Sequence, residues 1–228
     1  MDFFEVVNRR RSVRRYTGAA VPAEVMNKAL DAALLAPNSS NLQTWKFYWV
    51  SSTDKKKQLA EACLNQGAAR TADQLLVVVA SPDLWKKTSQ AILQQPVAPT
   101  AATQFRQYYS KLVPFTYGWR MVAPIKWLIF NLIGLWKPIM RRPWSSRDIQ
   151  EVSIKSACLG AENFMLAIAA QGFDTCPMEG FDESRVKRLL GLKCFERVVM
   201  VISVGERDPQ GIWGERYRCP RDWFIHQV

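Results

Sequence analysis

The chain has 228 residues, of which 48% are hydrophobic and 22% are charged, and its net charge is +11. This composition is typical of a globular protein with a large core, and we expect a single domain over residues 1–228. The only histidine, His226, excludes histidine-based zinc sites and catalytic triads, so no metal site is expected. Five scattered cysteines without a Cys-x-x-Cys pair argue against a disulfide framework. The positive charge points to an anionic partner: a phosphate cofactor, nucleic acid or lipid.

The N-terminal region combines a short helix with a basic block. Asp2 can cap a helix with an apolar face, and residues 8–16 then carry five arginines and Ser12. Because acidic and basic residues stand where a signal peptide would be apolar, we expect a cytoplasmic protein. Arginine presents a planar fork of donors that matches phosphate oxygens, so the block is a candidate anion clamp. A solvated basic face or a nucleic-acid patch is the alternative.

The next stretch predicts layered helices and strands. Helical spacing of apolar residues runs from Ala23 to the proline at Pro37, and a polar loop over 37–43 follows, which by itself is typical of an ordinary turn. Alternation predicts a strand over 44–50, and the continuous apolar run 75–80 predicts a strand covered on both faces. With a helix over 54–64 between them, the pattern indicates an α/β or α+β architecture.

The middle of the chain, from Ser81 to Trp144, is rich in proline, and its second half, an insert at about 119–144, is apolar and aromatic with basic flanks. The uncharged run 127–136 has ten residues, far fewer than the ~20 that span a bilayer. Three interpretations stay open for the insert: a helical lid, buried core, or an amphipathic segment in peripheral contact with a membrane.

The C-terminal third predicts one long helix, capped by Ser145 or Ser146 and ended by Gly172. Small residues form a stripe along it, which suits either a central or a dimer-interface helix; they are Ser153, Ala157, Gly160 and Ala161. A short helix over 183–190 and a strand over 197–204 follow. Residues 211–228 have no helical period and predict an extended aromatic arm that packs on a neighbouring subunit.

Three motifs in this order and spacing resemble the FMN-dependent nitroreductase family: Arg10–Arg14, Pro37–Trp45 and Cys176–Asp182. The resemblance covers the chain from about residue 2 to the tail, apart from the middle segment. It implies an α+β fold in which a mixed β-sheet is wrapped by helices. It also implies an intertwined homodimer whose C-terminal arms cross to the partner, with FMN bound at the dimer interface and NADH or NADPH as electron donor.

By position in these motifs, the resemblance assigns roles to individual residues. The phosphate, the ribityl chain and the pyrimidine edge of FMN would be held by Arg10, Arg11, Ser12 and Arg14, with Arg216 and Arg218 closing on the phosphate. The other subunit would contribute Pro37, Asn38 and Ser39, and the pyrimidine side would meet Asn65 or Gln66. The residues beside the isoalloxazine would be Pro177, Glu179 and Gly180, and the last two are the candidate catalytic residues, through a backbone N–H that points at N5.

The sequence departs from the family at three places. Thr44 stands where proline commonly precedes the tryptophan, and Asn38 stands where serine is frequent. The apolar insert occupies the place of the helices that roof the substrate channel. The resemblance therefore predicts the reaction better than the substrate.

The resemblance predicts an FMN-dependent NAD(P)H oxidoreductase. Hydride would pass from the nucleotide to flavin N5, and a nitroaromatic or quinone-type acceptor would then enter the same cavity, a two-electron ping-pong reaction in which the arginines favour the anionic reduced flavin. Two alternatives stay open: reductive dehalogenation or flavin modification on the same fold, and a non-catalytic basic module that binds nucleic acid or lipid. No recognition helix or RNA-binding aromatic motif is present, so no nucleic-acid partner is expected.

Overall fold

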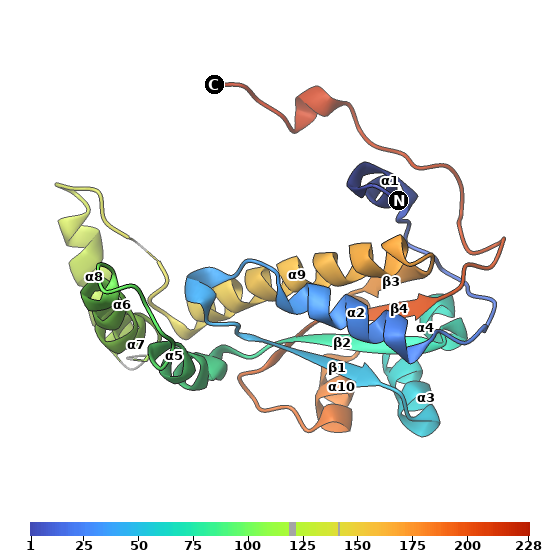
Figure 1. Ribbon diagram of the computed structural model, residues 1–228, viewed down its shortest axis with the longest axis horizontal. Helices are drawn as coiled ribbons and strands as arrows, with labels where there is room; N and C mark the ends of the chain where they lie inside the picture. The colour runs from blue at the N-terminus through green and yellow to red at the C-terminus, as the bar shows by residue number, and fades with distance from the viewer. Residues whose placement is uncertain (119–121, 141) are drawn as a thin grey trace.

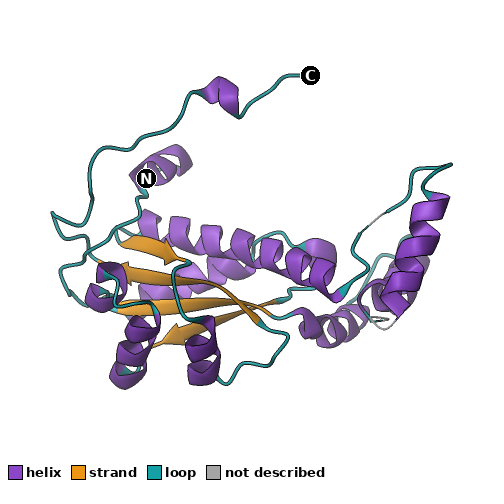
Figure 2. Ribbon diagram, turned by 180° about the vertical axis from the view of Figure 1, so that it is seen from behind, coloured by secondary structure: helices purple, strands orange, loops and turns teal. Residues whose placement is uncertain are grey.

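A four-stranded sheet lies at the centre of the part of the chain that the structure describes, residues 1–118, 122–140 and 142–228 of this computed structural model. The strand order is β1-β2-β4-β3, and all neighbours are antiparallel (Figure 2). The strands are β1 (Trp45–Val50), β2 (Gln74–Ala80), β3 (Asp174–Met178) and β4 (Arg197–Gly205). The predicted strands at 44–50, 75–80 and 197–204 are therefore confirmed to within one residue at each end.

The expectation of a mixed sheet is wrong for these four strands. The only parallel pairing in the described residues is an isolated bridge between Ser12 and Thr175. The Val13 N–H faces β3 in this pairing, and the Arg14 N–H, which faces the other way, donates to the carbonyl of Gly211 on the C-terminal arm. The α+β class itself is as expected.

Helices cover both faces of the sheet (Figure 1). The helices α2 and α9 pack on one face, and α3, α4 and α10 pack on the other. The α-helices of the described chain are α1 (Phe3–Arg9), α2 (Ala23–Leu34), α3 (Thr53–Ala62), α4 (Gly67–Thr71), α5 (Trp85–Leu93), α6 (Ala102–Gln107), α7 (Val113–Tyr117), α8 (Ala123–Ile133), α9 (Ser146–Ala170) and α10 (Glu183–Leu190).

Strand β2 explains the continuous apolar run in the sequence. Leu75, Val77 and Val79 belong to the core under α3, α4 and α10, whereas Leu76 and Val78 belong to the core under α2 and α9. Successive side chains of a strand point to opposite faces, so a strand with two covered faces needs apolar residues at every position. Antiparallel pairing on both sides with β1 and β4 completes its burial.

The long helix α9 is the central helix of the chain. It begins at a capping box in which the Ser145 hydroxyl accepts from the Asp148 N–H and the Asp148 carboxylate accepts from the Ser145 N–H. Its stripe of small residues is buried against α2 and β1: a Cβ on Gly160 would lie 2.9 Å from Cζ of Phe47 and 3.3 Å from the Ala33 carbonyl oxygen. Of the described helices, α9 alone is long and apolar enough to cross a membrane, but half of that apolar stretch is buried inside the protein.

Strand β3 was not predicted, although its residues were singled out as a motif. Pro177 lies inside it and pairs with Ile202 of β4. Proline lacks a backbone N–H, so it is tolerated only where a strand has one free edge, and β3 is an edge strand. Because proline is unusual in strands, the sequence pattern did not reveal β3.

Two parts of the molecule lie outside the sheet and its helical layers. Helices α5 to α8 form a lobe at one end, and residues 211–228 form an extended arm that passes α1 (Figure 1). A separate small core joins the lobe to the start of α9, and it includes Trp85 and Tyr117 of the lobe and Ile149 of α9. The predicted extended arm is confirmed, apart from one turn at Arg221–Trp223. Residues 119–121 and 141 of the predicted insert lie outside the described residues.

Candidate functional site

Residues 10–16 leave α1 in an extended conformation and pass beside β3. The Val13 N–H donates to the Thr175 carbonyl oxygen at 3.0 Å. Side chains alternate along extended backbone, so Val13 is buried in the core while Ser12 and Arg14 face outward. The buried valine and the bond to β3 together determine where the outward polar groups lie.

The C-terminal arm returns to this arginine block and closes a cavity over it. The Arg14 N–H donates to the Gly211 carbonyl at 2.7 Å, and the Arg11 guanidinium donates to the Gly214 carbonyl at 2.6 Å. The cavity has a volume of about 300 Å³. Its lining includes the six residues predicted to hold a phosphate: Arg10, Arg11, Ser12, Arg14, Arg216 and Arg218.

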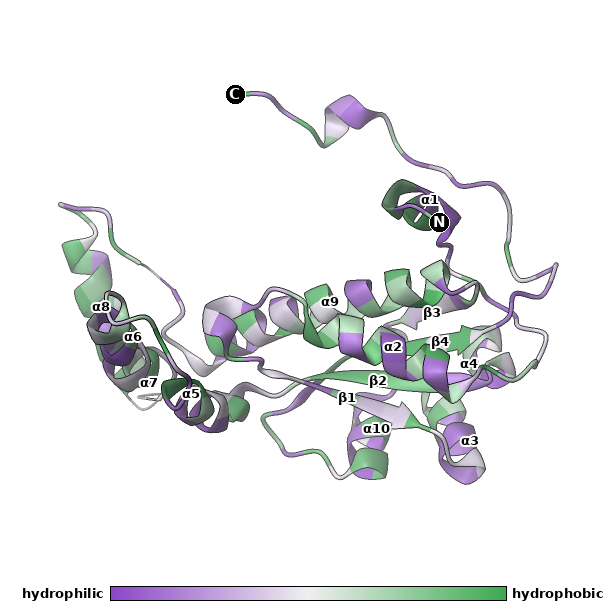
Figure 3. Cartoon of the chain, viewed as in Figure 1, coloured by the Kyte–Doolittle hydropathy of each residue, from purple (hydrophilic) through white to green (hydrophobic). Residues whose placement is uncertain are grey.

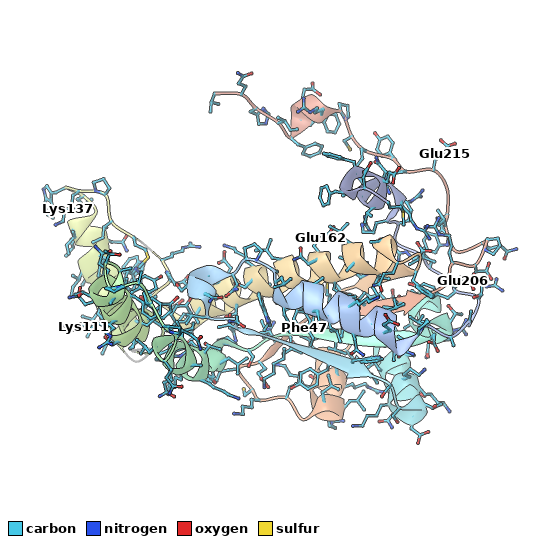
Figure 4. All side chains as sticks on the ribbon, in the orientation of Figure 1. Phe47, Lys111, Lys137, Glu162, Glu206 and Glu215 are labelled. Atoms are coloured by element: carbon cyan, nitrogen blue, oxygen red, sulfur yellow. The ribbon has the colours of Figure 1, made fainter. Side chains whose placement is uncertain are left out.

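Positive charge dominates this cavity. Its described lining holds five arginines and one carboxylate, that of Glu215 on the arm (Figure 4). The pKa of Arg216 is lowered from its ordinary value by loss of solvent and by the neighbouring guanidiniums of Arg11, Arg218 and Arg10. Cations that disfavour one another's charge in this way are stabilised by an anion placed among them. The arrangement is suited to a phosphate or another compact anion.

Arg216 has a structural role within this cluster. Its guanidinium donates to the carbonyl oxygens of Asn8, at 2.7 Å, and Arg10. These carbonyls lie at the end of α1 and in the residue after it, where the helix has no further N–H groups to satisfy them. Arg216 therefore attaches the arm to the C-terminus of α1, so much of its donor capacity is already used.

A second hollow continues from the first. Arg14 and Trp213 line both, and the Arg14 guanidinium lies 5.2 Å from the centroid of the Trp213 ring. This hollow has a volume of about 760 Å³ and includes Gln66. The Gln66 amide donates to the Gly180 carbonyl at 2.6 Å, so two predicted residues from distant parts of the sequence meet here.

Another residue of the last motif, Glu179, lies near Cys158 in the middle of α9. Pro177 is within β3, and the carboxylate of Glu179 adds to burial in raising the pKa of the Cys158 thiol on α9. Asn65, beside Gln66, is exposed and has a φ of 53°, a left-handed conformation that asparagine tolerates better than most residues. Of the predicted residues in these two segments, Gln66 lines the second hollow and contacts Gly180.

The loop with Pro37, Asn38 and Ser39 is not brought to the arginine block of its own chain. Asn38 stabilises its own turn, because its carboxamide oxygen accepts from the Gln43 N–H at 2.8 Å. The Ser39 N–H approaches the Ser156 hydroxyl, whereas Arg9 of the basic block donates to Gly172. Ser156 lies 14 residues before the last residue of α9, Ala170, and Gly172 follows that end, so the two anchor points are separated by roughly 20 Å of helix.

Trp213 is the principal residue that sequence reasoning missed. It is 85% exposed and lies between Gly211 and Gly214. A Cβ at Gly211 would overlap the Arg15 carbonyl oxygen, and Gly214 has a φ of +145°, so the backbone here requires glycine at both positions. The signal that could have revealed it was this pair of glycines around a tryptophan in a segment without periodicity.

Two cysteines close to residues of these hollows, Cys63 and Cys176, are buried. Burial raises the pKa of Cys63 to about 12, and burial also raises that of Cys176 although Arg14 and Arg10 act in the opposite direction. Both side chains are fully buried. Thiols with raised pKa values and no access to solvent are poor nucleophiles, so these two residues serve packing.

Comparisons with known proteins point to one family. A family model described as Nitroreductase family matches residues 7–206. The protein MhqN of Bacillus subtilis (strain 168) is 26% identical over 231 residues, which cover 100% of this chain and 99% of MhqN. A Thermus thermophilus protein named NADH dehydrogenase is 28% identical over 213 residues, 93% of this chain and 90% of that relative.

A solved structure agrees with the family match at the level of the fold. A protein from Exiguobacterium sibiricum 255-15, solved in complex with FMN, superposes with a TM-score of 0.72 at 22% identity. The match covers 100% of this chain and 98% of that one.

Proposed function

This chain belongs to the nitroreductase family, and from that premise we propose that it reduces nitroaromatic or quinone-type acceptors by two-electron transfer from NAD(P)H. Membership makes it an NAD(P)H:FMN oxidoreductase. The observation that carries the proposal is the cavity in which two ends of the chain bring five arginines and Ser12 together, beside the Gln66–Gly180 contact.

The donor set of this cavity fits FMN. A phosphate monoester is a compact dianion, and arginine forks with a hydroxyl are the groups that bind it most strongly. Arg10, Arg11, Ser12, Arg14 and Arg218 would hold the phosphate and ribityl chain, whereas Arg216 holds the arm in place through the carbonyls of α1. Gln66 and Asn65 would meet the pyrimidine side, with Pro177, Glu179 and Gly180 beside the ring.

FMN, when bound, supplies the redox chemistry by accepting hydride from NAD(P)H and passing two electrons to the acceptor. The chain's own contribution is binding and orientation. The arginine cluster holds the anionic end, and the bond from Gln66 to Gly180 fixes the loop after β3 against α4. Glu179 is the one carboxylate among the residues assigned to the ring, and solvent is the proton source in this proposal.

The proposal includes a homodimer. One chain holds Pro37, Asn38 and Ser39 far from its own arginine block, so a site that uses both needs two copies. Large apolar side chains on α1 and the arm also lie exposed in the single chain: Phe4 is 75% exposed and Tyr217 is 75% exposed. A crossing arm from a second copy would cover such side chains.

The test is an absorbance spectrum of the purified protein, followed by anaerobic additions of NADH and of NADPH. Flavin bands that either nucleotide bleaches, and that a nitroaromatic or quinone restores, are the expected result. Arg10→Ala combined with Ser12→Ala should weaken FMN binding by about 10- to 100-fold, since each change removes a bond to a charged group.

The matched control is Arg188→Ala, on an exposed position of α10 away from the cavity. It should bind FMN as the unchanged protein does. A protein that neither contains nor takes up FMN would refute the assignment, and a bleached flavin that no nitroaromatic or quinone reoxidises would refute the acceptor class.

A further inference from the structure

The net charge of the protein is concentrated in one stretch of the chain. Residues 84–147 contain ten of the 31 lysines and arginines and none of the 20 aspartates and glutamates, so they account for nearly all of the net charge of +11. The described part of this stretch forms the lobe of α5 to α8 (Figure 1). The lobe is therefore strongly basic, while the rest of the molecule is close to neutral.

Helix α8 in this lobe buries its charged residue and exposes most of its large apolar side chains. Its one charged residue, Lys126, is only 5% exposed; it donates to the Phe115 carbonyl, and its ammonium lies 4.6 Å from the centroid of the Phe115 ring. Loss of solvent lowers the pKa of Lys126. The opposite side, which we call the α8 outer face, consists of apolar side chains that are each 48–59% exposed: Ile125, Trp127, Leu128, Ile129 and Leu132.

The apolar surface continues beyond the helix. Leu135 is 69% exposed and Trp136 is 81% exposed, and Figure 3 shows hydrophobic segments among hydrophilic ones on the lobe at this end of the molecule. The same lobe carries basic side chains, including Lys111 and Lys137 (Figure 4). A helix of a water-soluble protein normally turns its charged residues outward, so this arrangement needs an apolar partner.

We propose that the α8 outer face docks on the surface of a bilayer that contains anionic lipid. Leucine, isoleucine and tryptophan enter the boundary between headgroups and acyl chains, and lysine and arginine contact the anionic headgroups. The helix lies on the surface because α8 has 11 residues, whereas a span needs about 20. The proposal does not depend on the redox function.

The charge and the apolar surface of the lobe favour an anionic bilayer over two other partners, a second lobe and nucleic acid. A second lobe against the first would place two acid-free basic surfaces in contact, so symmetric lobe-to-lobe pairing is opposed by repulsion. Nucleic acid would engage the cations but would leave the outer face of leucine, isoleucine and tryptophan in water. An anionic bilayer satisfies both the charge and the apolar surface.

The test is co-sedimentation of the full-length, FMN-loaded protein with vesicles of phosphatidylcholine alone and with vesicles that also contain phosphatidylglycerol. The expected result is sedimentation with the anionic vesicles and much less with the neutral ones. Leu128→Gln, Ile129→Gln and Leu132→Gln in one variant should lower partitioning by more than about tenfold, because they remove the apolar part of the contact while keeping good helix formers.

A charge variant separates the two contributions. Lys111→Gln with Lys137→Gln should lower partitioning by about tenfold or more, since each cation near an anionic surface adds favourable energy. The matched control is Lys55→Gln with Lys57→Gln on α3, an equal change of charge at exposed positions outside the lobe. The control should sediment as the unchanged protein does.

Three outcomes would overturn the proposal. One is failure of the unchanged protein to sediment with anionic vesicles. Another is equal sedimentation of the leucine and isoleucine variant. The third is a change in that variant's oligomeric state by light scattering, which would assign the α8 outer face to a second copy. Flavin absorbance and NAD(P)H oxidation with a water-soluble acceptor, measured on the same samples, show separately whether the enzyme is intact.

Discussion

The side-chain amide of Gln66 donates a hydrogen bond to the backbone carbonyl of Gly180, with 2.6 Å between nitrogen and oxygen. The same amide donates to the Cys63 carbonyl at 3.0 Å, so both of its hydrogens are used. Gln66 immediately precedes α4 and Gly180 follows β3. This one side chain therefore connects two loops that the proposed FMN site needs in a defined relative position.

Gln66→Leu replaces the amide with an apolar group of nearly the same size, so both loops lose their shared hydrogen-bond donor. FMN binding should weaken by about tenfold. The expected loss of stability is about 1–2 kcal/mol. Titration of the apoprotein with FMN and denaturant unfolding measure the two effects. Gln58→Leu, at an exposed position of α3, is the control. Equal FMN affinity in the two variants would show that the Gln66 bond does not position the site.

Arg216→Leu should release the arm from α1. The guanidinium satisfies the carbonyls of Asn8 and Arg10, so its removal leaves helix-end acceptors without a partner and lowers stability by about 1–2 kcal/mol. Cleavage of the arm by trypsin in the absence of FMN should become faster. The control is Arg221→Leu, further along the arm and exposed. Unchanged cleavage rates would mean that other contacts hold the arm.

Gly160→Ala tests the close packing of α9. The added methyl group would lie 2.9 Å from Cζ of Phe47 and 3.3 Å from the Ala33 carbonyl oxygen, which belongs to the backbone of α2. Overpacking of this kind costs about 1–3 kcal/mol, which exceeds the gain of about 1 kcal/mol in helix propensity. We expect a lower midpoint of denaturant unfolding.

The control for that change is Glu162→Ala, which alters the exposed side of the same helix. Figure 4 shows Phe47 and Glu162 on opposite sides of α9. This control should unfold at or above the midpoint of the unchanged protein, because alanine is the better helix former. A Gly160→Ala variant that is more stable than the unchanged protein would show that α2 and Phe47 can move apart at little cost.

The ion pair between Lys46 and Glu196 predicts a dependence of stability on pH. Burial would raise the pKa of Glu196, but hydrogen bonds from Lys46, the Lys193 N–H and Ser81 outweigh it and lower the pKa. A lowered pKa in the folded state adds stability above the unfolded value, about 4.3, and this stability is lost as pH falls through the folded pKa.

The free energy of unfolding should therefore fall below about pH 4.3, and Glu196→Gln should make that decline shallower. The control is Glu24→Gln, which removes the exposed pair with Lys28 and should change the profile little, because surface pairs contribute little. Urea unfolding at a series of pH values gives both curves. Parallel declines in the unchanged protein and Glu196→Gln would contradict the assignment.

Several elements could be predicted because their signals are local. The apolar run of β2 follows from two covered faces, and the capping box with Ser145 and Asp148 marks the start of α9. The stripe of small residues in α9 suited either a central helix or a dimer-interface helix. Gly160 of this stripe is buried against α2 of the same chain, as in a central helix. Strand β3 could not be predicted with the same rules, because Pro177 is typical of turns unless the strand lies at an edge.

The sequence by itself determined the chemistry available to the candidate site: arginine forks and a hydroxyl that suit an anion, and a single histidine, His226, which is too few for a histidine-based zinc site. Only the tertiary structure decided which residues meet. It brought Arg218 and Trp213 of the arm over Arg14, kept Ser39 away from them, and turned Lys126 of α8 inward. These relationships depend on contacts between residues far apart in the chain, and local propensity and periodicity do not encode such contacts.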